Sequence, residues 1–216
     1  MVNHSEYTRK PSGPSRILYL GMNGPFSLPP LAALLEHGFG PAAVLTPPPG
    51  GLGVAFRQVS VPEGPEQAGE NLYRFAARRG IPVFEAGRLD DPRALALLEG
   101  LDYIIAACFP RLLPPGWLAA PRRGCLNLHP SLLPAYRGPY PVEDQLAAGE
   151  TQTGITLHRM DAAADTGDIF LQESYAVPPD ATVDSLTRLA AARGADLLVR
   201  YLSQPEKYPG RPQSGL

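Results

Sequence analysis

The sequence lacks the features that define several common classes of protein. Its 216 residues include only two cysteines, Cys108 and Cys125, which are too few for a disulfide framework or an unaided zinc site. Both have apolar neighbours, so we interpret them as buried thiols and expect no metal. No run of about 18 apolar residues is present, so the sequence predicts no membrane-spanning helix. Residues 1–15 also lack an apolar core typical of a signal peptide, so we expect a cytoplasmic protein without membrane contact.

Charge of either sign is scarce and nearly balanced. With 19 Lys+Arg and 21 Asp+Glu, the formal net charge is −2, which argues against a large basic surface and predicts no nucleic-acid partner. Proline and glycine are plentiful, at 26 and 22 residues, and several cluster near the ends of the chain. We therefore expect a flexible N-terminal arm at 1–15, one domain at 16–204 and a flexible C-terminal tail at 205–216.

Short apolar runs alternate with segments of helical periodicity in the first part of this domain. The strands are expected at 16–20, 42–46, 81–84, 101–107 and 124–129, and the helices at 28–37, 67–79 and after Asp90 or Asp91. This alternation predicts an α/β fold with a Rossmann-like, mostly parallel twisted sheet and helices on both faces. Pro82 places the strand at 81–84 at an edge of that sheet.

The second half has a different pattern. It predicts a helix at 141–149, strands at 153–158 and 168–174 as an antiparallel extension, and a long helix at 182–202.

Polar residues follow several of the expected strands. In an open parallel sheet, ligands bind at the carboxyl ends of the strands. Asn127 and His129 close one strand and, by alternation, share one face of it. An amide and an imidazole together could stabilise an oxyanion and move a proton. A turn-forming Asn and a buried structural His would give the same residue types, so composition alone leaves both interpretations open.

Longer motifs around these residues carry a resemblance. They are Asn127-Leu-His-Pro-Ser-Leu-Leu-Pro134 with Tyr136-Arg-Gly138, Thr153-Gly-Ile-Thr-Leu-His158, Asp165-Thr-Gly-Asp168 and Phe109-Pro-Arg-Leu-Leu113. In this order and spacing they resemble the formyltransferases that use 10-formyltetrahydrofolate. That family includes glycinamide ribonucleotide, methionyl-tRNA and amino-sugar N-formyltransferases. The resemblance covers roughly residues 16–204 and implies the formyltransferase fold.

The resemblance also implies roles for individual residues. Asn127, His129 and Asp165 correspond to the catalytic residues. The folate-binding walls correspond to Phe109, Arg111, Leu112 and Leu113 on one side and to Asp161, Ala162, Ala163 and Asp165 on the other. We assign acceptor binding to Met22, Asn23 and Arg137.

The resemblance predicts a mechanism that agrees with the chemistry of these side chains. An amine attacks the formyl carbon, and Asn127 with protonated His129 stabilises the oxyanion. Asp165 holds His129 and helps to relay the amine proton through water to the folate nitrogen.

The resemblance leaves the acceptor open. The segment from Thr46 to Arg57 has one charged residue, the chain ends soon after the helix at 182–202, and the turn at 21–26 is a poor phosphate-binding loop. These departures favour an amino sugar, often nucleotide-linked, over methionyl-tRNA or glycinamide ribonucleotide. Alternatives of another class are a formyltetrahydrofolate hydrolase and a catalytically silent folate-binding module. A homodimer is also open, because a single such domain leaves apolar surface uncovered.

Overall fold

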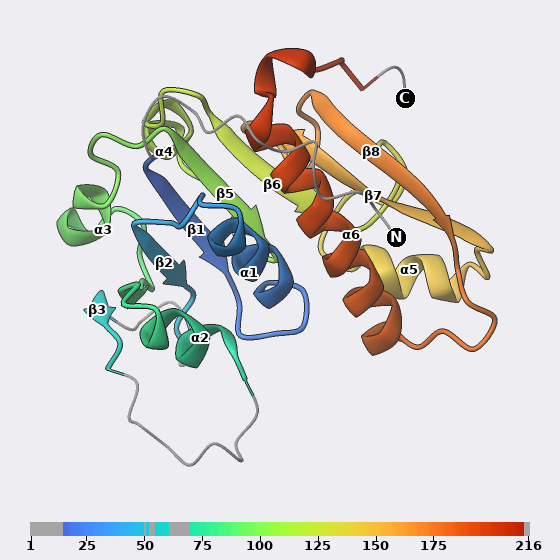
Figure 1. Ribbon diagram of the computed structural model, residues 1–216, viewed down its shortest axis with the longest axis horizontal. Helices are drawn as coiled ribbons and strands as arrows, with labels where there is room; N and C mark the ends of the chain where they lie inside the picture. Colours follow the sequence, from blue (N-terminus) through green and yellow to red (C-terminus); the bar gives the residue numbers. More distant parts are fainter. Residues whose placement is uncertain (1–14, 50, 52–54, 61–69, 214–216) are drawn as a thin grey trace.

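The computed structural model describes residues 15–49, 51, 55–60 and 70–213. Its strands form one eight-stranded sheet in the order β3-β4-β2-β1-β5-β6-β7-β8 (Figure 1). The strands are β1 (Ile17–Gly21), β2 (Ala43–Thr46), β3 (Arg57–Gln58), β4 (Val83–Glu85), β5 (Tyr103–Ala107), β6 (Cys125–His129), β7 (Gln152–Arg159) and β8 (Ile169–Ala176).

The central strands β4, β2, β1, β5 and β6 run parallel, whereas β3, β7 and β8 pair antiparallel with their neighbours. The predicted mostly parallel sheet with an antiparallel extension is therefore confirmed. Among the described residues, no helix combines the length and the apolar character that a membrane span requires.

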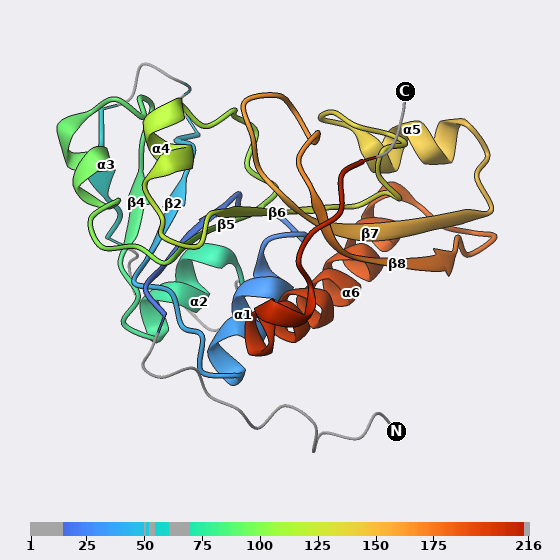
Figure 2. The ribbon, with the colours of Figure 1, turned by 90° about the horizontal axis from the view of Figure 1, so that it is seen from above.

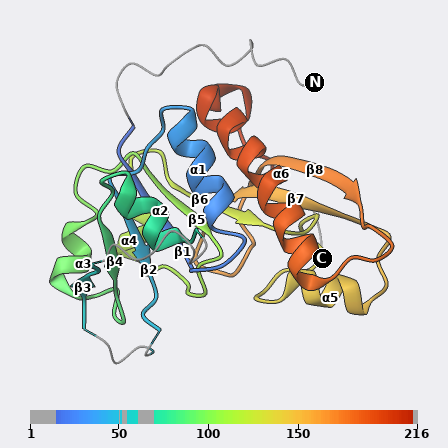
Figure 3. The ribbon, with the colours of Figure 1, turned by 60° about the horizontal axis from the view of Figure 1, so that its bottom comes forward.

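Helices cover both faces of this sheet, as Figure 2 shows. The helices are α1 (Leu28–Glu36), α2 (Leu72–Arg78), α3 (Pro92–Ala96), α4 (Pro115–Ala119), α5 (Pro141–Ala147) and α6 (Val183–Ser203), and a short 3₁₀ helix, η2 (Pro205–Lys207), follows α6. Side chains of α1, α2 and α6 join one buried cluster, and side chains of α3 and α4 join a second cluster on the other face. Figure 3 shows α1 and α6 side by side.

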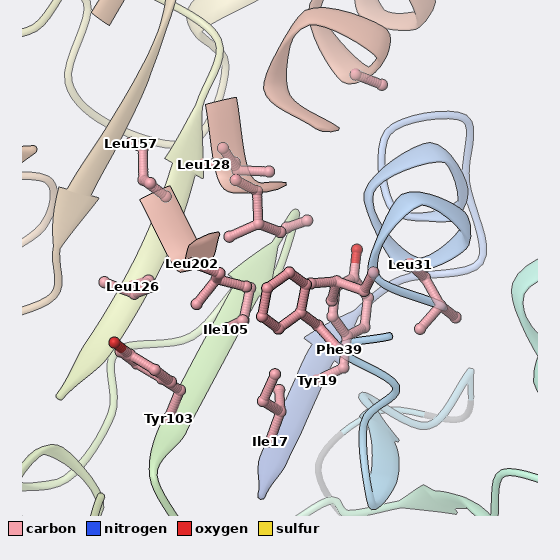
Figure 4. Close-up of a cluster of buried hydrophobic side chains, with 14 of the residues drawn as sticks. Ile17, Tyr19, Leu31, Phe39, Tyr103, Ile105, Leu126, Leu128, Leu157 and Leu202 are labelled. Carbon is pink, nitrogen blue, oxygen red and sulfur yellow. The ribbon is translucent and has the colours of Figure 1, made fainter. Parts of the chain in front are cut away.

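The larger cluster holds most of the aromatic core. Tyr19, Phe39 and Tyr103 pack there among leucines and isoleucines from the strands and helices (Figure 4). Each fully buried side chain of this size contributes about 1.5–3 kcal/mol to stability. This packing fixes the strands whose ends form the candidate site.

Local signals explain where several helices begin. Pro29 and Pro30 lie in the first turn of α1, where a missing N–H is tolerated. Asp91 caps α3 by accepting the N–H of Arg93, which settles the choice between Asp90 and Asp91. Thr182 and Ser185 form a reciprocal capping box at the start of α6.

The structure differs from the sequence predictions at three places. The strand after Pro82 is not at an edge, because β3 pairs with Phe84 and Glu85, beyond the proline that lacks an N–H. The short helix α4 and β3 itself were not predicted. The predicted helix at 67–79 is α2, which begins at Leu72 with Asn71 as its cap, and residues 67–69 lie outside the described residues.

Part of the C-terminal tail that we expected at 205–216 has regular structure. Residues 205–213 contain η2, and Arg211 forms a β-bridge with Ile169 at the start of β8. Figure 2 shows this dark-red segment running back over the sheet. Backbone hydrogen bonds to a strand edge hold the segment in place despite its proline and glycine content. The expected N-terminal arm, apart from residue 15, lies outside the described residues.

Candidate active site

The candidate site lies at the carboxyl ends of β1, β5 and β6. The chain runs from β1 outward to β2 and β4, then returns to β5 on the other side of β1. This reversal is the topological switch point at which open α/β sheets bind ligands.

Ser27 closes the turn after β1. Its buried hydroxyl accepts the N–H of Met22 at 3.0 Å and donates to the carbonyl of Ala107 at the end of β5, at 2.6 Å. Its position just before α1 suggests an ordinary helix cap, so sequence reasoning missed this link. Cys108, which we expected to be buried, is exposed because it lies just beyond β5 with a φ of 61°.

β6 presents Asn127 and His129 toward the same region. Their neighbours Leu126 and Leu128 point into the larger core cluster, so alternation leaves the two polar side chains on the opposite face. The predicted shared face is confirmed. β7 runs antiparallel to β6 and places His158 directly opposite Asn127.

Asp165 completes this cluster from the loop between β7 and β8. Its Oδ1 accepts a hydrogen bond from Asn127 Nδ2 at 3.2 Å, and its Oδ2 lies 3.5 Å from His129 Nδ1. The Gly138 N–H also donates to Oδ2, at 3.0 Å. The structure therefore brings together the three residues that we predicted to be catalytic.

The hydrogen bonds of His129 define which nitrogen carries its proton. Nε2 lies 2.7 Å from the carbonyl oxygen of Tyr136, so it must donate. In the neutral ring, Nδ1 is then the basic nitrogen, and it faces Asp165. Burial lowers the pKa of His129, and the charge of Asp165 opposes this effect only in part. We therefore describe His129 as neutral in the free site, and the protonated His129 that we expected at the oxyanion stage stays a prediction.

Asp165 is held as a carboxylate. Burial alone would raise its pKa, but the contacts with His158 and His129 and the N–H of Gly138 outweigh burial. Together they lower the pKa of Asp165 to about 2. The site thus holds a fixed negative charge beside a neutral imidazole at neutral pH.

These pKa shifts predict how stability depends on pH. The depressed pKa of Asp165 contributes about 2 kcal/mol of stability above about pH 4, and this is lost as the pH falls through about 2. Because the pKa of His129 is also depressed, stability falls as the pH drops below its ordinary value of 6.5.

Urea unfolding across this pH range would measure both losses. Asp165→Asn should reduce the acid loss while leaving the loss near neutral pH. Equal acid losses in the variant and the parent protein would contradict the assignment to Asp165.

The Nδ2 group of Asn127 has two partners in the free site. One N–H points to Asp165, and the nitrogen lies 3.1 Å from His158 Nε2. Because His158 Nδ1 donates to the carbonyl of Arg159 at 2.7 Å, its Nε2 is free to accept from Asn127. His158 therefore orients the Asn127 amide from the neighbouring strand.

The residues that we expected to bind folate have different environments. Leu112 is exposed and Phe109 is half-buried, whereas Leu113 is buried in the second core cluster. Arg111 donates to the carbonyl of Ala86 at 3.1 Å. Leu113 can therefore offer a ligand only backbone atoms.

The second expected wall is a tight turn. Asp161 Oδ1 accepts from the N–H of Ala163 and from the Thr166 hydroxyl, so this carboxylate stabilises the turn. Ala162 and Ala163 are exposed and present mainly backbone.

The expected acceptor residues lie at the edge of the cluster. Met22 and Asn23 are exposed in the turn after β1. Arg137 follows the loop after His129, and its guanidinium donates to the side chain of Gln213. Nothing in the sequence around Gln213 indicated this contact. Within the described part of the chain, no group of three or more His, Cys, Asp or Glu side chains could hold a metal ion.

Comparisons with known proteins show which family and fold the chain resembles. A family model described as formyl transferase matches residues 67–202. A methionyl-tRNA formyltransferase from Syntrophus aciditrophicus is 39% identical over 203 residues, which are 91% of this chain and 61% of that relative. The chain therefore spans about three fifths of the length of this curated relative.

Two solved structures share the fold at lower identity. A phosphoribosylglycinamide formyltransferase from Bacillus halodurans has a TM-score of 0.67 at 23% identity, covering 90% of this chain and 100% of that chain. An N-formyltransferase from Helicobacter canadensis, solved with folinic acid and dTDP-3-aminofucose, has a TM-score of 0.66 at 19% identity, covering 92% of this chain and 68% of its own.

Proposed function

Because the chain belongs to the formyl transferase family, we propose that it transfers the formyl group of 10-formyltetrahydrofolate to a primary amine, with Asn127, His129 and Asp165 acting on the reacting atoms. One observation carries this assignment: Asp165 contacts both Asn127 and His129 at the carboxyl end of β6.

The amine nitrogen attacks the formyl carbon, and the carbonyl oxygen becomes an oxyanion. We assign Asn127 Nδ2 as the donor that stabilises this charge. Its 3.1 Å contact with His158 would be exchanged for a contact with the oxyanion, while Asp165 keeps the amide oriented. A preorganised donor of this kind contributes on the order of 10²–10³ in rate.

The attacking amine must then lose a proton, and the folate nitrogen must gain one as its bond to the formyl carbon breaks. His129 Nδ1 can take up a proton because its Nε2–H is already committed to Tyr136. Asp165, 3.5 Å away, stabilises the imidazolium that forms. The same proton can then pass through water to the departing nitrogen.

Folate binding is proposed along the two segments that the resemblance identified. The exposed Leu112 and the half-buried Phe109 provide apolar surface on one side, and the backbone of Asp161, Ala162 and Ala163 would form the other. Short side chains suit recognition through main-chain groups, because they let a planar ring approach the backbone.

For the acceptor, we now favour the amine of methionyl-tRNA over an amino sugar. The relative at 39% identity is named a methionyl-tRNA formyltransferase, whereas the sugar-bound structure at 19% identity supports the fold alone. This choice also replaces our expectation that the protein has no nucleic-acid partner. The near-neutral charge of the chain is the main argument against a tRNA acceptor, because tRNA binding normally uses a basic surface.

One assay separates these activities. The protein is incubated with 10-formyltetrahydrofolate and either methionyl-tRNA, a nucleotide-linked amino sugar, glycinamide ribonucleotide or no amine, and tetrahydrofolate release is followed. Release that depends on methionyl-tRNA would support the proposal. Release without any amine would indicate a hydrolase, and folate binding without release under any condition would indicate a silent binding module.

A further inference from the structure

The side-chain amide of Gln213 joins two loops of the candidate site. Its Nε2 donates to the carbonyl of Asp165 at 2.9 Å and to the carbonyl of Gly167 at 2.8 Å. Its Oε1 accepts from Arg137 Nε at 3.1 Å and Nη2 at 2.6 Å. All four hydrogen-bonding positions of the amide are used, and only one orientation of the amide satisfies them.

The backbone around Gln213 is anchored independently. Arg211 and Ile169 exchange two backbone hydrogen bonds of 2.9 Å, which hold the segment against the start of β8. The Arg211 guanidinium also donates to Gln172 Oε1 at 3.1 Å. The backbone two residues before Gln213 is therefore held against β8, and the Gln213 side chain extends from there to the site.

The turn that Gln213 contacts adopts an unfavourable backbone conformation. Asp165 has a φ of 54°, in the left-handed region that non-glycine residues rarely adopt. Gly167 packs so closely that a Cβ there would lie 2.2 Å from the Arg159 carbonyl oxygen. The Arg159 carbonyl therefore packs against the turn at Gly167. The Gln213 amide binds the carbonyl groups of Asp165 and Gly167 in the same turn.

The same amide also sets the loop that follows His129. Arg137 is held by Gln213, and the next residue, Gly138, donates its N–H to Asp165 Oδ2. The Asp165 turn and the Arg137 loop are therefore joined twice, once by the Gly138–Asp165 hydrogen bond and once through Gln213. Both links end on Asp165, whose carboxylate contacts Asn127 and His129.

We infer that Gln213 is a positioning residue for formyl transfer, which fixes the Asp165 turn relative to the Arg137 loop. This inference rests on the proposed function of the site. Displacing a reacting group by a fraction of an ångström lowers the rate more than it lowers binding, since positioning acts mainly on the transition state.

Two variants and one matched control test this role. Gln213→Met keeps the size of the side chain and removes all four hydrogen bonds. Gln213→Glu keeps an acceptor for Arg137 and removes both donors to the turn. Gln204→Met is the control, because Gln204 lies in the same C-terminal segment and its side chain makes no hydrogen bond within the described residues.

In the assay with the active acceptor, both Gln213 variants should lose kcat by about tenfold, with KM for 10-formyltetrahydrofolate and Tm matching those of Gln204→Met. A kcat within twofold of the parent in both Gln213 variants, or an equal loss in Gln204→Met, would overturn the inference.

Hydrogen–deuterium exchange of the segment 161–168 provides a readout that does not need activity. Exchange should be faster in Gln213→Met and unchanged in Gln204→Met. If the parent protein transfers no formyl group, the proposed function fails, and this exchange result still decides whether Gln213 holds the turn. Unchanged exchange in Gln213→Met would overturn that role.

Discussion

Asp165→Asn is expected to lower kcat for formyl transfer by a factor on the order of 10³–10⁴, as replacing the orienting carboxylate of a catalytic histidine by an amide does elsewhere. Asp165 Oδ1 accepts from Asn127, and Oδ2 faces His129 Nδ1 and accepts from Gly138. An asparagine would remove the charge that stabilises a protonated His129. It would also place an N–H donor against at least one existing donor.

The matched control is Asp168→Asn, three residues further along the same loop. The Asp168 side chain makes no hydrogen bond or ion pair within the described residues, so this variant should keep the parent's kcat. Steady-state kinetics with the acceptor that proves active in the release assay measure both effects. If the Asp165→Asn variant keeps more than about a tenth of the parent's kcat, this carboxylate has no role at the reacting atoms.

The central sheet could be predicted from the sequence because its strands are covered on both faces. β1, β2 and β5 are short and fully buried, so each appears as an apolar run bounded by turn residues. β3 could not be predicted, because Arg57 and Gln58 are exposed and polar, and their pairing with β4 has no apolar pattern in the sequence.

Only part of the candidate site could be predicted from the residues alone. Alternation along one strand was enough to place Asn127 and His129 on one face. Asp165 is separated from them along the chain by α5, β7 and the connecting loops, so only the resemblance linked it to them. The protonation state of His129 depends on its burial and on the Tyr136 carbonyl, neither of which a sequence pattern reveals.

Gln213 shows a further limit of sequence reasoning. Proline and glycine around it predict irregular backbone, and that prediction holds for the local conformation. Whether an irregular segment is held in place depends on tertiary partners, here Ile169, Arg137 and the Asp165 turn. These partners are between 44 and 76 residues away along the chain, as their positions in the sequence show.

His129→Ala is expected to lower kcat on the order of 10²–10³, since it removes the group that takes up the amine proton. Folding should survive, because the imidazole is not part of either core cluster and its loss leaves space that water can enter. His37→Ala, at the exposed end of α1, is the control and should keep the parent's kcat.

The combination of the two variants distinguishes a coupled pair from two independent groups. If Asp165 acts largely through His129, the double variant Asp165→Asn/His129→Ala should have about the same kcat as Asp165→Asn alone. If the two acted independently, the losses would multiply to a factor on the order of 10⁵ or more. Because Asp165 also orients Asn127, kcat should be somewhat lower in Asp165→Asn than in His129→Ala. Single-turnover rates would resolve this difference. Multiplicative losses would contradict the proton transfer proposed for His129 Nδ1.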